Sequence, residues 1–217
     1  MLNINAKFPS YKDHLNKTFL EEMGYKIWST KGARFQANHR LVTIDRLSNV
    51  SLSFLNAYLI IFGLLAVYQI SNESLLSANA VAFGSTAISI LLLVFSQIEI
   101  SRDYKVRAHM YHECSLKLSE LYNEHRAFKT LGHSTDDQKK KFALEISTKY
   151  QSVLGNYTNH DNIDYEKFKN ENSEYFKLSW FEVQLFRAKY YLRVKFLYHA
   201  LIATPIFIFA SYLMIKS

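Results

Sequence analysis

The densest group of residues that could bind a metal or transfer a proton is His160, Asp161 and Asp164. Imidazole and carboxylate groups are common metal ligands, but a metal needs several ligands that converge at about 2.0–2.2 Å. The sequence has no second group of such residues at a recognisable metal-ligand spacing. Asn, Asp and His are also frequent in turns and helix caps. We therefore expect capping residues here, and neither a metal nor another cofactor.

A second candidate for chemistry is Cys114, the single cysteine, with His112 two residues before it. On a helix, residues two apart lie on different faces, so this pair is poorly placed to act together. The sequence also lacks a Gly-rich phosphate loop, a G-x-S-x-G elbow, a CxxC pair and an H-E-x-x-H motif. We predict that the protein is not an enzyme.

A third set of polar residues lies within an apolar stretch. On a helix, Ser85, Ser89 and Ser96 project within about 40° of one another, and Gln97 and Glu99 follow them. Their hydroxyl groups could line a water-filled path through several assembled copies, with a ring of Glu99 carboxylates favouring cations. Small hydroxyl residues are equally typical of contacts between membrane helices. The sequence leaves pore lining and helix packing open.

The elements that would hold these residues begin with two uncharged apolar stretches, residues 52–70 and 80–98. At about 1.5 Å per residue, each nearly crosses a hydrocarbon core of about 30 Å. Only residues 71–79 connect them, so we predict an antiparallel transmembrane hairpin. A buried hairpin of a soluble protein is the alternative.

Charges beside these stretches predict their orientation. The flanking cations are Lys31, Arg34, Arg40 and Arg46 before the first, and Arg102, Lys105 and Arg107 after the second. The connection contains Glu73 and no Lys or Arg. Because cytoplasmic loops carry the excess of Lys and Arg, both outer ends of the hairpin are expected in the cytoplasm. These cations also explain much of the net charge of +7, which is otherwise typical of a nucleic-acid partner.

A third apolar run, residues 196–215, is also long enough to cross a membrane. The cations that precede it are Arg187, Lys189, Arg193 and Lys195. His199, Thr204 and Pro205 lie inside the run, and a proline is tolerated there if neighbouring groups bond the freed carbonyl. We expect a third span; a helix that packs on the hairpin or on another subunit is the alternative.

Between the second and third runs the sequence predicts cytoplasmic helices. No Pro or Gly interrupts residues 102–131, so the second span could continue straight into the cytoplasm. Apolar and aromatic residues recur there at steps of three and four, which predicts a seam for assembling copies. The seam residues are Tyr111, Leu118, Leu121 and Phe128, with Cys114 and His125 between them.

A shorter helix is expected next. Ser134 and Asp137 have the spacing of a capping box, and Gly155 is a typical C-terminal stop. Its apolar face would contain Ala143, Ile146, Tyr150, Val153 and Leu154. A polar connector then leads to an amphipathic helix after Ser179.

The predicted fold is therefore an all-α membrane protein, in which a transmembrane helical hairpin continues into a cytoplasmic helical bundle. Residues 1–50 would form cytoplasmic N-terminal helices, and residues 51–99 the hairpin. Residues 100–195 would form the cytoplasmic helical domain, and residues 196–217 the C-terminal apolar helix.

Several short motifs resemble the SLATT family, bacterial two-transmembrane effectors associated with antiviral conflict systems. They comprise the segment WSTKGARF at residues 28–35, Arg-Leu at 40–41, Asn-His at 159–160 and Asp-Tyr at 164–165, in this order around the hairpin. The residues that carry the resemblance are Thr30, Lys31, Arg34, Arg40, Asn159, His160, Asp164 and Tyr165.

The resemblance implies a homo-oligomeric effector that permeabilises the bacterial inner membrane and arrests or kills the infected cell. A separately encoded sensor, such as a reverse transcriptase or a nucleotide cyclase, would trigger it. The Asn-His and Asp-Tyr pairs look most like members paired with reverse transcriptases. The alternative is a non-conducting membrane anchor or scaffold whose cytoplasmic helices dock a partner complex. Direct binding of nucleic acid is not expected.

Overall fold

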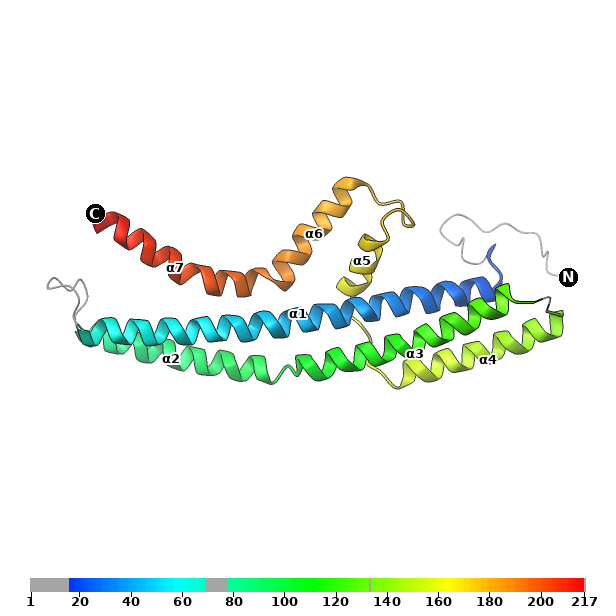
Figure 1. Cartoon of the computed structure of the whole chain (residues 1–217), viewed down its shortest axis with the longest axis horizontal. Coiled ribbons are helices and arrows are strands. Elements are labelled where there is room, and N and C mark those ends of the chain that lie inside the picture. Colours follow the sequence, from blue (N-terminus) through cyan, green and yellow to red (C-terminus); the bar gives the residue numbers. More distant parts are fainter. Residues whose placement is uncertain (1–15, 69–77, 133, 217) are drawn as a thin grey trace. The chain divides into compact units, whose positions relative to one another are not determined.

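The computed structural model describes residues 16–68, 78–132 and 134–216. Throughout these residues the regular structure is helical, so the predicted all-α class is confirmed (Figure 1). The helices are α1 (Phe19–Tyr68), α2 (Ala78–Ile100), α3 (Tyr104–Thr130), α4 (Asp136–Gly155), α5 (Asn162–Glu171), α6 (Trp180–Val194) and α7 (Phe196–Lys216). Only six Gly and two Pro residues occur in the chain, so few positions interrupt helical backbone.

These helices form two compact units. The first contains the start of α1, most of α3, and the whole of α4 and α5. The second contains the remainder of α1, the first residues of α3, and α2 and α7, together with α6 apart from Trp180. α1 passes from one unit to the other between His39 and Arg40.

α1 is a single helix of 50 residues, about 75 Å long at the usual rise per residue. The sequence suggested separate N-terminal helices before the first apolar stretch. Instead, one helix carries the flanking polar segment and the apolar stretch without a break. The predicted connection at residues 71–79, including Glu73, lies largely outside the described residues.

The lack of Pro and Gly suggested that the second span continues straight into the cytoplasm. The structure shows instead a break between α2 and α3. α2 ends at Ile100 and α3 begins at Tyr104. Asp103, between them, has a φ of 47°, in the left-handed region that a right-handed helix cannot include. Aspartate adopts this conformation more readily than most residues, so the break needs no glycine.

α4 begins with a capping box one residue later than predicted. The pair is Thr135 and Gln138 rather than Ser134 and Asp137. The Gln138 amide donates to Thr135 Oγ1 at 3.3 Å, and the Thr135 amide donates to Gln138 Oε1 at 2.9 Å. α4 ends at Gly155, where the sequence predicted its stop.

α4 packs into the core of the first unit through Phe142, Ile146 and Tyr150. The segment predicted as a polar connector also contains the ten-residue helix α5.

The row predicted as a seam between copies lies inside the core of one chain. Tyr111, Leu118 and Leu121 are buried, and the Phe128 ring stacks on Phe142 with centroids 3.9 Å apart. A spacing of three and four identifies a packed helix face but not the chain that covers it. Here α1 and α4 of the same chain cover it, so these side chains are not available to a second copy.

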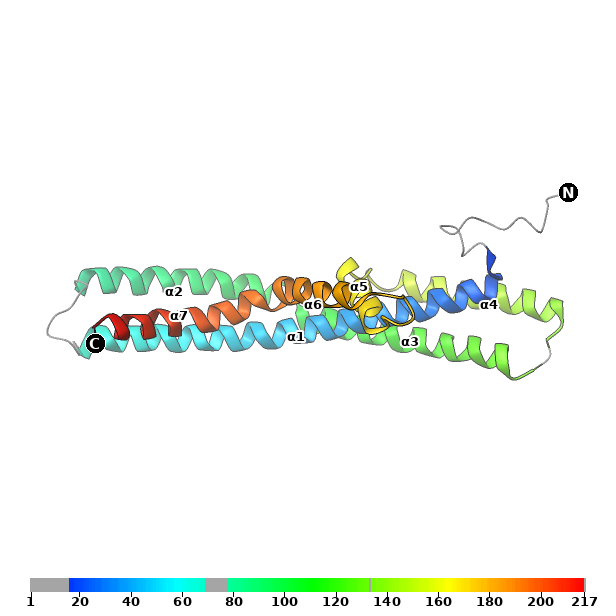
Figure 2. The same cartoon turned by 90° about the horizontal axis from the view of Figure 1, so that it is seen from above.

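In the second unit, α2 runs alongside the later half of α1 in both views (Figures 1 and 2). α7 contacts α1 where the Tyr58 hydroxyl donates to the carbonyl of Ile202 at 2.9 Å. Many large apolar side chains of this hairpin point outward, among them Ile60, Ile61, Phe83 and Leu91. By length and composition, stretches within Phe19–Leu64 and Ala82–Thr130 could cross a membrane, and Phe196–Phe207 is a shorter apolar helix.

Candidate functional site

The centre of the first unit holds a buried arginine. Arg34, on α1, is only 1% exposed. Its guanidinium donates to the carbonyl of Thr158 and to Asn159 Oδ1, the latter at 3.4 Å. Its carbon Cζ lies 5.5 Å from the centre of the Tyr111 ring, within the range of a cation–π contact. Two neutral oxygens and an aromatic face therefore contact a charge that is costly to bury without partners.

Tyr111, on α3, also holds this loop. Its hydroxyl donates to the carbonyl of Asn159 at 2.8 Å. Asp164, fully buried at the start of α5, accepts a bond from the Asp161 amide at 3.1 Å. The loop between α4 and α5 is thus fixed by side chains of α1, α3 and α5.

His160 lies in this loop, and its Nδ1 atom is buried with no hydrogen-bond partner among the described residues; Arg34 Nε is in the same state. Burial lowers the pKa of His160, and the charge of Arg34 lowers it further. Asp164 and Asp161 act in the opposite direction but do not cancel these effects. The site therefore favours neutral imidazole.

This lowered pKa predicts that acid destabilises the first unit. In the unfolded chain His160 takes up a proton near its ordinary pKa of 6.5, whereas the folded chain resists it. The free energy of unfolding of the first unit is therefore highest above pH 6.5 and decreases as the pH falls below that value. When the free energy of unfolding is measured at several pH values around and below 6.5, its dependence on pH should be weaker in His160→Gln than in the wild type. His109→Gln, which changes an exposed histidine of the same unit, should retain the wild-type slope.

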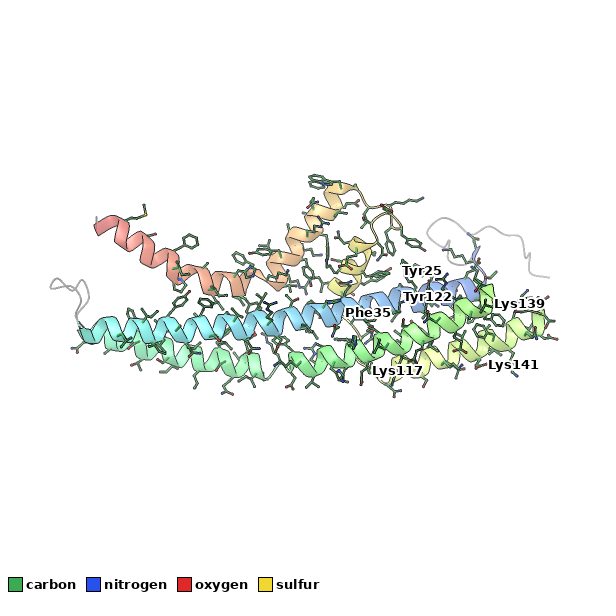
Figure 3. All side chains as sticks on the ribbon, in the orientation of Figure 1. Tyr25, Phe35, Lys117, Tyr122, Lys139 and Lys141 are labelled. Atoms are coloured by element: carbon green, nitrogen blue, oxygen red, sulfur yellow. The ribbon has the colours of Figure 1, made fainter. Side chains whose placement is uncertain are left out.

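The other residues of the SLATT-like motifs are spread along α1 and its neighbours. Thr30 and Tyr150 share a hydrogen bond of 2.9 Å between their hydroxyls, and the Lys31 ammonium lies 4.4 Å from the Tyr122 ring centre. Burial lowers the pKa of Lys31. The hydroxyls of Tyr165 and Tyr25 are 3.2 Å apart. Figure 3 labels Tyr25 and Tyr122 on the first unit.

The structure therefore gathers Arg34, Asn159, His160 and Asp164 around one loop of the first unit. Arg40, by contrast, belongs to the second unit, where it is buried. The motif residues are thus divided between the two units.

Sequence reasoning missed an aromatic cluster beside this loop. Trp28 packs edge-on against Phe168, with ring centres 4.8 Å apart, and against Tyr175, with centres 4.9 Å apart. Phe176 stacks on Trp28 at 6.2 Å. Aromatic residues are so frequent in this chain that their spacing did not distinguish the cluster. Gly32 inside a long helix was the available signal, because a glycine there usually marks a close approach.

In the second unit Glu99 is buried, not placed at an open mouth as predicted. It is 5% exposed and accepts a hydrogen bond of 2.9 Å from the Tyr198 hydroxyl. Arg102 lies 3.5 Å from its other oxygen and donates to Tyr104 at 2.8 Å. Where α2 breaks, the chain thus pairs this carboxylate within its own fold, because an unpaired buried charge would be costly.

The predicted pore-lining hydroxyls are bonded to their own helix. Ser85 donates to Ala82 at 3.0 Å, Ser89 to Ser85 at 2.7 Å and Ser96 to Leu93 at 2.8 Å, in each case to the backbone carbonyl. Gln97 is exposed. Such bonds satisfy each hydroxyl hydrogen locally and leave the oxygen able to accept, so both packing and pore lining are compatible with this arrangement.

Other chemistry finds little support in the described part of the chain. No group of three or more His, Cys, Asp and Glu residues converges there to hold a metal ion. Cys114 is fully buried, and burial raises the pKa of its thiol. A buried, protonated thiol is a poor nucleophile.

Comparison with known proteins assigns the family. Neither the curated proteins nor the solved structures gave a significant match. Residues 16–211, however, match a family of two-transmembrane (2TM) effectors along nearly the whole chain. Its 2TM description agrees with the two helical stretches that could cross a membrane. The chain belongs to the SMODS and SLOG-associating 2TM effector domain family 5, one of the SLATT families.

Proposed function

We propose that this protein is a membrane effector of bacterial antiviral defence, which oligomerises to permeabilise the inner membrane when a partner sensor triggers it. The carrying observation is the hairpin of α1 and α2, whose large apolar side chains point outward in a member of a 2TM effector family. A single hairpin cannot enclose a channel, so conduction requires several copies.

The proposed topology places both outer ends of the hairpin, and with them the first unit, in the cytoplasm. Cations lie on these ends and are missing from the connection at residues 71–79. A cytoplasmic sensor would then act on the first unit. α1 is one helix that belongs to both units. A movement of α1 at Arg34 would therefore be transmitted along the same helix to its apolar stretch in the membrane.

The sensor is proposed to be a separate protein of a SMODS or SLOG conflict system, in keeping with the family description. We expect the sensor to be a nucleotide cyclase or a reverse transcriptase.

Induced expression in a bacterial host, with and without the candidate sensor, tests the function directly. We expect loss of membrane potential and entry of a membrane-impermeant dye only when the trigger is present. A membrane potential that stays intact under the triggering condition would contradict a permeabilising role.

Three serine substitutions separate a pore from a scaffold. Ser85→Leu, Ser89→Leu and Ser96→Leu together should abolish conductance and preserve assembly if these hydroxyls line a path. Leu91→Ile, on the same helix, is the control and should conduct normally. Assembly is read by cross-linking in the membrane.

A non-conducting anchor is the second candidate, and one observation favours it. Glu99, predicted to form a carboxylate ring at a pore, is instead buried and accepts a hydrogen bond from Tyr198. Under this alternative, the serine variant keeps all activity, and the potential never collapses. The first unit would then dock a partner complex.

A further inference from the structure

α6, together with the first residue of α7, carries an apolar stripe that the rest of the described second unit leaves uncovered. At 100° per residue, the stripe positions fall within about 80° of one another. The stripe residues are Phe181, Leu185, Ala188, Leu192 and Phe196. The four large side chains are between 51% and 68% exposed. Val194, on the opposite side of the helix, is buried. α6 therefore packs through one face and presents a second apolar face outward.

Cations border this stripe. Between residues 180 and 196 the only acidic residue is Glu182, whereas four are basic. On the helical wheel, Lys195 lies next to one edge of the stripe, whereas Lys189, Glu182 and Arg193 follow one another beyond the other edge. Long cationic side chains at such edges extend their charge toward water while their stems cover apolar surface.

The stripe leads directly into the apolar helix α7. The Lys195 amide donates to the carbonyl of Tyr191 at 2.9 Å, and the His199 amide donates to the carbonyl of Lys195 at 3.1 Å. The helical bonding therefore continues through the short interruption at residue 195. An amphipathic helix with basic borders, continuous with an apolar helix, is typical of a segment that lies in a membrane interface.

We propose that α6 lies in the headgroup region of an anionic bilayer, with its stripe among the upper acyl chains and with Arg193 and Lys195 on lipid phosphates. This inference rests on the proposed membrane location of the chain and adds the lipid class that the surface recognises. Burial of the apolar stripe would supply binding that does not depend on the lipid headgroup, and the cations would strengthen binding to anionic lipid.

Charge favours lipid over a second copy as the partner of this face. Between residues 180 and 196 four basic residues outnumber the single acid Glu182, so two copies that met through their stripes would bring two net positive borders together. Like charges oppose such a contact, whereas lipid phosphates complement them.

A fluorescent probe on the stripe tests the proposal in the full-length chain. Leu185→Cys is labelled with a polarity-sensitive dye in a Cys114→Ala background, and the protein is reconstituted into phosphatidylcholine vesicles with rising fractions of phosphatidylglycerol. We expect spin-labelled lipid to quench the dye increasingly as the anionic fraction rises. Leu144→Cys, at another exposed leucine (72%) on α4, is the matched control and should not be quenched.

The cations are tested by the double variant Arg193→Gln/Lys195→Gln. Loss of two charges at an anionic surface should weaken docking roughly 25-fold, so half-maximal quenching requires more phosphatidylglycerol. Lys140→Gln/Lys141→Gln, which removes two exposed cations of α4, should leave the titration unchanged.

Each contrary outcome has a distinct meaning. If the protein resists alkaline extraction from the vesicles but spin-labelled lipid does not quench the dye at position 185, the inference about α6 is overturned. The membrane location of the protein then still holds. Energy transfer between labelled chains without lipid quenching also overturns it, in favour of a second copy. Extraction of the protein by alkali overturns the proposed function itself.

Discussion

Arg34→Ala is expected to destabilise the first unit by about 3 kcal/mol. The substitution removes charge-assisted hydrogen bonds to Thr158 and Asn159 and the contact with the Tyr111 ring. It leaves the Thr158 carbonyl and Asn159 Oδ1 without this donor and a space where a side chain 99% buried had been. The lost hydrogen bonds and the empty space both raise the free energy of the folded state. The unfolded chain is little affected, because water bonds these groups there.

The measurement is chemical unfolding in detergent, followed by hydrogen exchange of the α5 amides. Arg34→Ala should lower the unfolding midpoint and speed exchange in α5 and in the loop before it. Arg126→Ala, at an exposed arginine of the same unit, should change neither. Normal α5 protection in Arg34→Ala would show that the guanidinium does not hold the loop.

A conservative variant separates the shape of Arg34 from its charge. Arg34→Lys keeps one positive charge but loses the planar group that reaches two oxygens and stacks on an aromatic ring. We expect it to recover less than half of the lost stability. Full recovery would mean that charge alone is needed at this position.

The sequence predicted the two long apolar helices well because length and the absence of charge are local properties. Residues 52–70 and 80–98 fall within α1 and α2 apart from the undescribed residues 69–70. The break at Asp103 was missed because aspartate tolerates the left-handed conformation without any local signal from Gly or Pro.

The sequence was least informative about which surfaces pack within one chain. Leu118 and Leu121 have the spacing of a seam, yet they share a core cluster with Met23, Ile27 and Ile146 of the same chain. Glu99 looked like a pore residue from its place at a span end, but its partner Tyr198 is 99 positions away. Periodicity reveals that a face is buried, and only the tertiary fold reveals by what.

The same limit applies to the site around Arg34. The resemblance to SLATT proteins singled out Arg34 and Asn159 without any reason in local spacing, since 125 positions separate them. Their contact explains why both belong to one pattern: α1 must recognise the loop after α4. The aromatic cluster had no such motif, and it emerged only from packing.

Gly32→Ala is expected to destabilise the first unit by about 2 kcal/mol, although alanine is the better helix former. A Cβ atom at position 32 would overlap ring atoms Cδ2 and Cε2 of Phe168. That ring is buried against Trp28 and Phe176, so it cannot simply rotate away. The clash should separate α5 from α1.

A double-mutant cycle tests whether this clash is the cause. Phe168→Leu removes part of the ring, so Gly32→Ala should cost less in that background, with a coupling energy of about 1 kcal/mol. Gly155→Ala, where a Cβ atom meets nothing within 4 Å, should be neutral or slightly stabilising in the same unfolding assay. If Gly32→Ala costs the same with Phe168→Leu as without it, the close approach of α5 to α1 at Gly32 is not what requires glycine there.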